Sequence, residues 1–508
     1  MYSIVPVLMA TQHPDSASRY IGSRGEVEEA VLDLTPIESG GYGCDEKMVD
    51  YEGKLTPYHQ VEWVVEALIE AGFAPGRDFL ITPRIPSERL EGCVRQVMVL
   101  WGVMAANKRS LSLAGSQAIR FIVHPMSASS WELIATQKRI LKVQRLAEEE
   151  LGLRGAEPPC LIPLIEDVVR LINVDHIVSS LYSRLLSEGF VYEGIRVFLG
   201  KSDAALAYGH LASSIGLVVG LSRLYKWADR EGVRVYPIIG VGKPPFRGHL
   251  SPEAVSLFTR QYSGYHTVTI QSALRFDTPR SLYEETIRAL RENVAGKPRI
   301  LGGDEERVLV EAARIAASEY LVVLRELADT VSLVSKAIPK RRDRVSEEVY
   351  SRDLSNAAAF TGDRRLIGSP LRLVLPRAIK FTAAMYSIGL PPSLLGLGRG
   401  LRALGEKLGD QALDLVVKTL PLLERDVCVD LCYSNLELLE SYTSTKVAEL
   451  VREDINTLRD LLGVECCISV PNDYWDRLWR MRRLVSSGDN TSAQKACSEA
   501  AVLRGFLG

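Results

Sequence analysis

The sequence has 508 residues, of which 46% are hydrophobic, so it can bury a large core and is not that of a disordered chain. Its 61 basic and 63 acidic residues nearly cancel, which argues against a nucleic-acid or membrane partner bound through bulk charge. The start, MYSIVPVLM, does not have the form of a secretory signal, and no apolar run is long enough to span a bilayer, so we expect a cytoplasmic protein.

The eight cysteines include no CxxC pair. Cys428 and Cys432 are four residues apart on one face of an expected helix, and Cys466 and Cys467 are adjacent. Neither arrangement is typical of a zinc or redox site. We therefore expect buried, reduced thiols, which fit a cytoplasmic protein.

Eight short apolar runs alternate with segments of helical length through the first part of the chain. Each run leads into polar residues, in order Thr11 to His13, Asp50 and Glu52, Arg84, His124, Glu166, Asp203, Lys243 and Arg247, and Gln271 and Arg275. Eight strands that alternate with helices are typical of a (β/α)8 TIM-type barrel of the α/β class, whose active site lies where the strands end. We predict a catalytic barrel over residues 1–280.

The second run, in GYGCDEKMVDYEGK, is the weakest, because its polar and apolar residues alternate poorly and it could be a loop. A doubly wound open sheet is the competing architecture. Such a sheet carries a Gly-rich phosphate-binding loop between a strand and a helix, and neither GSRGE nor GGYGC has that spacing or position. The pattern therefore favours the barrel.

Beyond residue 280 the pattern becomes helical, and we predict a large all-helical region over residues 281–508, packed on the barrel. One stretch near 339–370 is polar, charged and irregular, which is typical of a mobile active-site loop. The stretch AAVLRGFLG at residues 500–508 is unusually apolar, so we expect it to dock onto the body of the protein.

Two carboxylates follow neighbouring runs in the predicted barrel. Glu166 and Asp203 could meet over one Mg²⁺ or Mn²⁺ ion and leave coordination sites for substrate oxygens. The alternative for Asp203 is a helix N-cap, because a helical pattern begins directly after it. Both interpretations stay open at this point.

Arginines and one histidine occupy other run ends. Arg84, Arg247 and Arg275 are suited to neutralise phosphate and carboxylate, although a lone Arg is usually a surface charge. His13 is the obvious general base near neutral pH, although a His before Pro is more often a turn or core residue. Together these residue types suit a phosphorylated acid that can form an enolate.

Seven motifs occur in order: MATQHPDSAS, GCDEKMVDYEGK, TPRIP, VFLGKSDAALAYG, PFRG, GYHTVTIQSALRFD and LPRAIKFTAAMYSIGLPP. They resemble archaeal-type phosphoenolpyruvate carboxylase, and the match covers nearly the whole chain. The resemblance implies a metal-dependent barrel enzyme, usually a homotetramer, that makes oxaloacetate and phosphate from phosphoenolpyruvate and bicarbonate. The implied route runs through carboxyphosphate and a metal-bound enolate and supplies C4 acids.

The resemblance also implies roles for particular residues. It makes Glu166 and Asp203 the ligands of Mg²⁺ (or Mn²⁺) and His13 the catalytic histidine. It places Arg84, Arg247 and Arg275 around the anions, with Arg247 among the catalytic residues and the other two binding substrate.

The sequence departs from the larger bacterial and plant relatives at three positions. Leu206 stands where they carry Lys, and Ile239 and Val241 align with their His and Arg. These changes put the bicarbonate contacts in doubt, and we expect Lys201 or Lys243 to substitute.

Two alternative functions remain from the sequence. The nearest is another metal-dependent, enolate-forming barrel lyase or aldolase that acts on a 2-oxo acid, needs no bicarbonate and releases no phosphate. The other is a non-catalytic helical assembly or binding protein that has kept a barrel and would tolerate loss of both Glu166 and Asp203.

Overall fold

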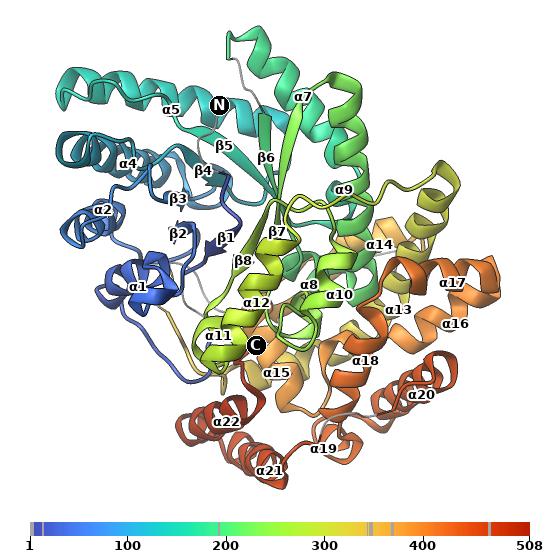
Figure 1. Cartoon of the computed structure of the whole chain (residues 1–508). Coiled ribbons are helices and arrows are strands. Elements are labelled where there is room, and N and C mark those ends of the chain that lie inside the picture. Colours follow the sequence, from blue (N-terminus) through green and yellow to red (C-terminus); the bar gives the residue numbers. More distant parts are fainter. Residues whose placement is uncertain are drawn as a thin grey trace.

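The computed structural model describes residues 5–12, 15–190, 194–342, 344, 349–366, 370–465 and 469–508. Eight parallel strands form a closed barrel in chain order (Figure 1). They are β1 (Leu8–Ala10), β2 (Glu46–Asp50), β3 (Leu80–Arg84), β4 (Phe121–His124), β5 (Cys160–Ile165), β6 (Gly194–Gly200), β7 (Arg234–Gly240) and β8 (Thr267–Ile270). Each strand falls in one of the eight predicted runs, so the predicted barrel is confirmed.

The second run is a full strand in spite of its poor pattern. β2 is buried over its whole length and pairs with β3 from Glu46 opposite Leu80 to Asp50 opposite Arg84. Its polar side chains tolerate burial because they have charged partners, as when Glu46 forms an ion pair of 2.7 Å with Arg196 of β6. Such pairs join residues far apart in the sequence, so the local alternation does not reveal the strand.

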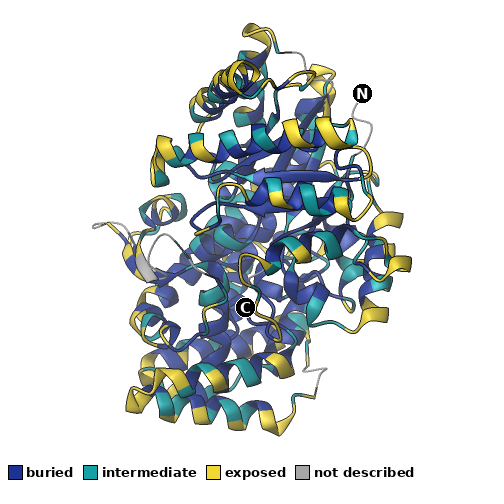
Figure 2. Ribbon diagram, turned by 90° about the vertical axis from the view of Figure 1, so that its left-hand side faces the viewer, coloured by how far each residue is buried: buried dark blue, intermediate teal, exposed yellow. Residues whose placement is uncertain are grey.

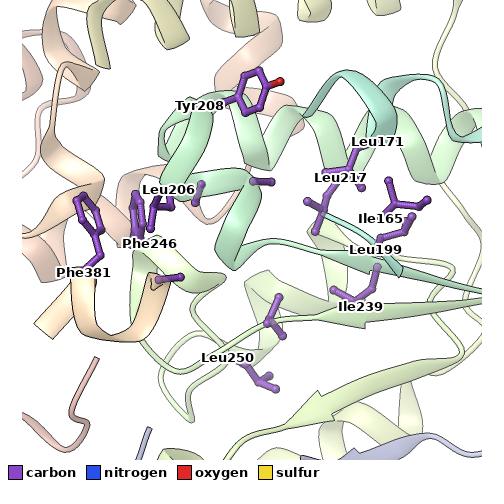
Figure 3. Packing of buried hydrophobic residues seen from close by; sticks show 14 of the residues in the cluster. Ile165, Leu171, Leu199, Leu206, Tyr208, Leu217, Ile239, Phe246, Leu250 and Phe381 are labelled. Carbon is purple, nitrogen blue, oxygen red and sulfur yellow. The ribbon is translucent and has the colours of Figure 1, made fainter. Parts of the chain in front are cut away.

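Alternating strand residues face two apolar clusters. Ile165, Leu199 and Ile239 lie on the neighbouring strands β5, β6 and β7 and belong to the main core with Leu171 and Leu217 (Figure 3). Successive residues of a strand point to opposite faces of the sheet, so the residues next to these three face the interior of the barrel. A separate cluster is formed by Met9, Met48, Leu80, Phe121, Val123, Ile162, Leu164, Phe198 and Ile238. It fills the barrel with side chains, as expected for eight strands.

Helices surround the barrel between successive strands (Figure 1). The longer ones are α1 (Gly25–Leu34), α2 (Gln60–Glu70), α4 (Cys93–Ala114), α5 (Ser130–Glu150), α7 (Val174–Ser187), α9 (His210–Glu231) and α12 (Arg280–Glu292). Short helices and turns fill the loops: η1 (Ile37–Ser39), α3 (Glu88–Glu91), α6 (Val168–Ile172), α8 (Ser202–Tyr208), η2 (Pro245–Arg247), α10 (Val255–Gln261) and α11 (Ser272–Phe276). Two of these, α8 and η2, follow strand ends and carry candidate site residues.

The chain from α13 onward is mostly helical, as predicted for the C-terminal part. It contains α13 (Gly303–Ser335), α14 (Ser355–Thr361), α15 (Ala378–Ser387), η3 (Pro392–Leu394), α16 (Leu397–Leu408), α17 (Asp410–Thr419), α18 (Leu423–Cys432), α19 (Leu436–Glu440), α20 (Thr445–Leu462), α21 (Asn472–Ser487) and α22 (Asn490–Arg504). The stretch expected as a loop holds α14 and β9 (Val349–Asp353), which pairs antiparallel with β10 (Arg372–Pro376). The structure therefore adds a two-stranded sheet to this region.

Barrel and extension share one hydrophobic core. Phe246 of η2 and Phe381 of α15 have ring centroids 5.7 Å apart, and Figure 3 shows them beside Leu206. Figure 2 shows buried residues continuing from the barrel into the surrounding helices, with exposed residues along the outer helix faces. The extension is therefore packed against the loops that carry the site.

The cysteines differ from the expectation. Cys428 and Cys432, both in α18, are each disulfide-bonded, so the prediction of reduced thiols is wrong for these two residues. Cys44 and Cys497 are free and buried, whereas Cys93 is free but exposed. Cys466 and Cys467 lie outside the described residues. Among the described helices, none combines the length and apolar character needed to cross a membrane.

Candidate active site at the barrel mouth

Glu166 and Asp203 lie beside the ends of two paired strands. Glu166 follows β5, and Asp203 is the second residue of α8, directly after β6. A Cβ added at Gly200, the last residue of β6, would lie 2.9 Å from Cγ of Glu166, so this glycine leaves the room that Glu166 occupies. The N-cap position of α8 is Lys201, without a side-chain cap, and Asp203 lies inside the helix. The alternative interpretation of Asp203 as an N-cap is therefore wrong.

The two carboxylates interact electrostatically. Burial and the neighbouring Asp203 together raise the pKa of Glu166 to about 8, although the positive charge of Arg84 opposes the rise. A divalent cation between the two carboxylates would offset the repulsion of their negative charges. In the described part of the chain no group of three or more His, Cys, Asp or Glu residues forms a metal site. Two carboxylates nevertheless fit Mg²⁺, which commonly takes one or two from the protein and its other ligands from water and substrate phosphate.

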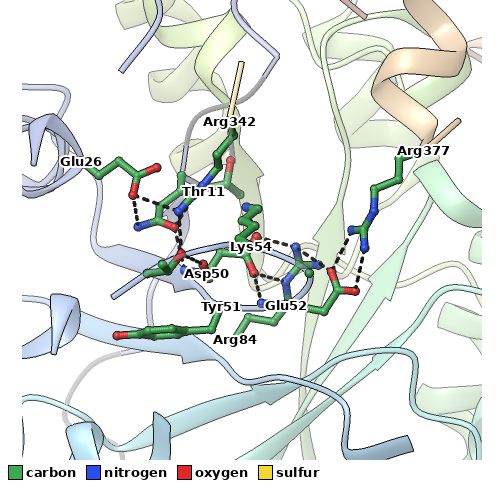
Figure 4. A network of polar contacts seen from close by, with 12 residues as sticks. Thr11, Glu26, Asp50, Tyr51, Glu52, Lys54, Arg84, Arg342 and Arg377 are labelled. Carbon is green, nitrogen blue, oxygen red and sulfur yellow. Dashed lines mark hydrogen bonds and ion pairs between the residues drawn. The ribbon is translucent and has the colours of Figure 1, made fainter. Parts of the chain in front are cut away.

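Arg84 interacts electrostatically with Glu166 and belongs to a polar network that Figure 4 shows with Asp50, Glu52 and Arg377. Arg84, at the end of β3, donates to both carboxylate oxygens of Asp50 at 2.8 and 2.6 Å and lies 3.8 Å from Glu52. Arg377, just before α15, forms an ion pair of 3.3 Å with Glu52. Gly53 has a φ of +64°, and a Cβ there would lie 2.3 Å from the Arg377 guanidinium. Any larger residue at this turn would clash with the Arg377 side chain, so glycine leaves the space that Arg377 occupies.

Two further arginines reach the mouth from the segment 339–370. Arg352 of β9 lies 3.3 Å from Asp203 and donates a hydrogen bond to it. Arg342 donates to Gln12 and Glu26 at 2.9 Å. Sequence reasoning did not single out these residues or Arg377. The concentration of arginines in this irregular stretch was the available signal.

The first predicted catalytic residue, His13, lies outside the described residues, as does Pro14. The residues on either side of them are firmly held. The Gln12 side chain accepts from Asp50 N at 2.9 Å and donates to Gln60 at 3.0 Å. The Asp15 side chain accepts from Ser272 Oγ at 2.5 Å.

Arg247 lies in η2, after β7, and joins four parts of the mouth. Its Nε donates to Ser202 Oγ at 3.0 Å, beside Asp203. Its Nη1 donates to Asp15 at 3.2 Å and to the Gly508 carbonyl at 2.6 Å, and its Nη2 donates to Gln271 at 2.5 Å. Burial lowers the pKa of Arg247, and the negative charges of Asp15 and Asp203 oppose that fall.

The 506–508 segment docks beside Arg247, as its apolar character predicts. Phe506 and Leu507 are buried. The Phe506 ring meets Tyr386 edge-on with centroids 5.3 Å apart, and Leu507 N donates to the Asp15 carbonyl at 2.9 Å. The predicted docking is confirmed.

Arg275 lies in a different environment. It is fully buried and forms ion pairs with Asp33 and Glu29, which also bind Lys47. Its Nη2 also donates to the Thr11 carbonyl at 2.6 Å. The structure thus joins Arg275 to the turn after β1, and not to the Glu166 and Asp203 pair.

The two candidate lysines have their ammonium groups occupied. Lys201 donates to His210 O at 3.2 Å and to the hydroxyls of Ser213 and Ser214 at 3.2 and 2.5 Å. Lys243 likewise has three acceptors, among them the Gly505 carbonyl at 2.9 Å. An ammonium has three donors, so a bicarbonate contact from either lysine requires an exchange of partners. At the three positions where the sequence differs from the bacterial and plant relatives, the apolar side chains of Leu206, Ile239 and Val241 are fully buried.

Comparison with known proteins confirms the resemblance noted in the motifs. The model of a family described as phosphoenolpyruvate carboxylase matches residues 5–508. The phosphoenolpyruvate carboxylase of Methanosarcina acetivorans is 38% identical over 481 residues, covering 91% of this chain and 90% of that protein. That of Pyrobaculum islandicum is 37% identical over 464 residues, covering 91% and 93%. The chain belongs to the archaeal-type phosphoenolpyruvate carboxylase family.

Proposed function

We propose that this protein carboxylates phosphoenolpyruvate with bicarbonate and releases oxaloacetate and phosphate. The observation that carries the proposal is the meeting of Glu166 and Asp203 at two adjacent strand ends, bordered by Arg84, Arg352 and Arg377. Two acids suit a divalent cation, and several arginines suit a substrate with a phosphate and a carboxylate.

Glu166 and Asp203 would hold the metal, Mg²⁺ or Mn²⁺. When bound, the ion supplies positive charge where the enol oxygen becomes negative. Arg352 forms an ion pair of 3.3 Å with Asp203. A cation held by Asp203 would compete with Arg352 for this carboxylate, which would leave the guanidinium for a substrate anion. We keep the mobile loop near 339–370 as a prediction.

Arg84 and Arg377 would bind the phosphate and carboxylate of phosphoenolpyruvate. Their guanidinium groups are held by Asp50 and Glu52, which fixes their orientation before the substrate arrives. A planar guanidinium binds such anions through two parallel hydrogen bonds. Their charge also reduces the repulsion between the substrate and bicarbonate.

The reaction then follows in two parts. A bicarbonate oxygen attacks phosphorus, the bond to the enol oxygen breaks, and carboxyphosphate and the enolate of pyruvate form. His13 takes the carboxyl proton of carboxyphosphate, which separates into CO₂ and phosphate. The enolate carbon attacks CO₂ to give oxaloacetate. Arg247, next to Ser202 and Asp203, would stabilise the charge that develops between the two reactants.

Arg275, Lys201 and Lys243 would support this site indirectly. Arg275 holds the turn that leads to His13, Lys201 holds the start of α9, and Lys243 holds the 505–508 segment. We keep the cytoplasmic location and the homotetramer as predictions.

The test is to measure oxaloacetate and phosphate formation from phosphoenolpyruvate with bicarbonate or Mg²⁺ omitted in turn. We expect both products in equal amounts, and neither in the absence of bicarbonate or metal. Turnover that needs no bicarbonate and releases no phosphate would contradict the proposal and favour the lyase or aldolase alternative.

A further inference from the structure

A buried carboxylate on the helical extension joins two loops of the barrel mouth. Asp426, in the first turn of α18, is 3% exposed. Its Oδ1 lies 2.5 Å from Nδ1 of His249, and its Oδ2 lies 2.9 Å from Nε2 of His210. His249 follows β7, two residues after Arg247, and His210 begins α9, shortly after the Ser202–Asp203 turn. One side chain thus binds the loops of two neighbouring strands.

The backbone at His249 is strained. His249 has a φ of +55°, in the left-handed region that a residue with a Cβ rarely adopts, and it follows Gly248 at +119°. Hydrogen bonds close the loop on both sides, from Gly242 N to Arg247 O at 2.7 Å and from Leu250 N to Gly242 O at 3.0 Å. Such strain persists only where surrounding contacts enforce it. The Asp426 carboxylate contacts this residue from outside the loop.

The two loops also touch at the mouth itself. Arg247 Nε donates to Ser202 Oγ at 3.0 Å, and Lys201 Nζ donates to the carbonyl of His210 at 3.2 Å. These contacts form a closed ring. On one side, the backbone joins Arg247 to His249, and Asp426 joins His249 to His210. On the other side, Lys201 joins His210 to Ser202, which contacts Arg247. A ring of this kind fixes the position of Arg247 relative to Asp203 more firmly than the single Ser202 contact does.

The charges suit a tight link. Burial alone would lower the pKa of His249, but the hydrogen bond to Asp426 and the Glu253 carboxylate 3.8 Å away raise it to about 9. Burial would raise the pKa of Asp426, but the two histidines bring it below its ordinary value. An ionised carboxylate therefore faces a charged His249 away from solvent, where charge-assisted hydrogen bonds are strong.

We propose that Asp426 is a positioning residue, which holds His249 and His210 together and thereby sets the distance between Arg247 and the Ser202–Asp203 turn. The inference rests on the proposed function, because its purpose is to keep Arg247 and the metal-binding Asp203 in reacting geometry. Arg84 and Arg377, which would bind phosphoenolpyruvate, lie outside this ring. Loss of the link should therefore slow the chemical steps more than it weakens substrate binding.

The experiment compares Asp426→Asn, His249→Asn and the double variant in the full chain with Mg²⁺. Asn keeps the size of Asp426, and at position 249 it is among the residues that best tolerate positive φ. We expect each single variant to lower kcat for oxaloacetate at least tenfold and to change KM for phosphoenolpyruvate less than threefold. The double variant should lie within about twofold of the slower single one, because both break the same link. Asp414→Asn, an exposed change on α17, is the matched control and should behave as wild type.

Three results would overturn the inference. One is an unchanged kcat in a folded Asp426→Asn or His249→Asn variant. The second is a double variant whose loss is the product of the two single losses. The third is a parallel change in KM, kcat and melting temperature, which would indicate a purely structural role. If Asp426→Asn does not fold, His249→Asn carries the test. A wild type that makes no oxaloacetate overturns the proposed function as well, whereas an active wild type with unaffected variants overturns this inference alone.

Discussion

Gly508→Ala adds a single methyl group to the segment that docks beside Arg247. Its Cβ would lie 2.1 Å from the Ile379 carbonyl oxygen and 2.8 Å from Ala383 N. Ordinary carbon–oxygen contacts are about 3.3 Å or longer, so the backbone at residue 508 must move by about 1 Å. The hydrogen bond from Arg247 to Gly508 O is now 2.6 Å, and a shift of this size brings it to the limit of a hydrogen bond. Arg247 then loses one of the partners that orient it.

We expect kcat/KM for oxaloacetate formation to fall by roughly 100-fold, since displacement by about 1 Å in an active site has effects of that order. The overpacking should cost about 1–3 kcal/mol of stability, which in a chain of this size lowers the melting temperature by only a few degrees. Gly405→Ala on α16 is the matched control, because its Cβ meets nothing within 4 Å. A Gly508→Ala variant with the kcat/KM of Gly405→Ala would refute the reasoning.

Three further predictions concern other parts of the mouth. His13→Asn should lower oxaloacetate formation by about 100-fold or more, the usual contribution of a general base, while phosphate and pyruvate are still released in a bicarbonate-dependent way; an unchanged ratio of pyruvate to oxaloacetate would exclude this role. Deletion of residues 506–508 should reduce activity more than about 100-fold. A cooperative melting transition should remain, since the loss of buried Phe506 and Leu507 costs only about 3–6 kcal/mol of stability. A fully active deletion variant would show the segment to be dispensable. Without metal, the stability of the fold should fall as pH rises from 4.5 towards 8, because burial and Asp203 raise the pKa of Glu166 to about 8 in the folded state. Glu166→Gln should flatten this fall in a series of melting curves. An equal dependence on pH in both proteins would argue against the raised pKa of Glu166.

The strands of the barrel could be predicted because polar residues follow the C-terminal end of each apolar run. That pattern located Glu166, Asp203, Arg84 and Arg247 at strand ends without any knowledge of their partners. β2 was harder to recognise, because Glu46 is buried by an ion pair with Arg196, 150 positions later in the chain. Local periodicity carries no information about such a partner.

The same limit explains the arginines. Arg275 and Arg84 look alike at the ends of their runs, yet Arg275 is buried by Asp33 and Glu29, which come from α1. Arg352 and Arg377 contact Asp203 and Glu52 only after the chain folds back from the extension. Which arginine is used for structure and which faces the mouth depends on these distant acids. The composition of the 339–370 stretch pointed to the right region, but not to the residues within it.

Equilibrium binding of Mn²⁺ in the absence of substrate tests most directly whether Glu166 and Asp203 together hold the divalent cation. Wild type, Glu166→Gln and Asp203→Asn would be titrated alongside Glu188→Gln, a change on the exposed surface. We expect each site variant to weaken Mn²⁺ binding by more than about 100-fold, since even residues that only support metal ligands contribute about 10- to 100-fold. The Glu188→Gln control should bind as wild type. Wild-type Mn²⁺ affinity in a folded Glu166→Gln or Asp203→Asn protein would contradict the account.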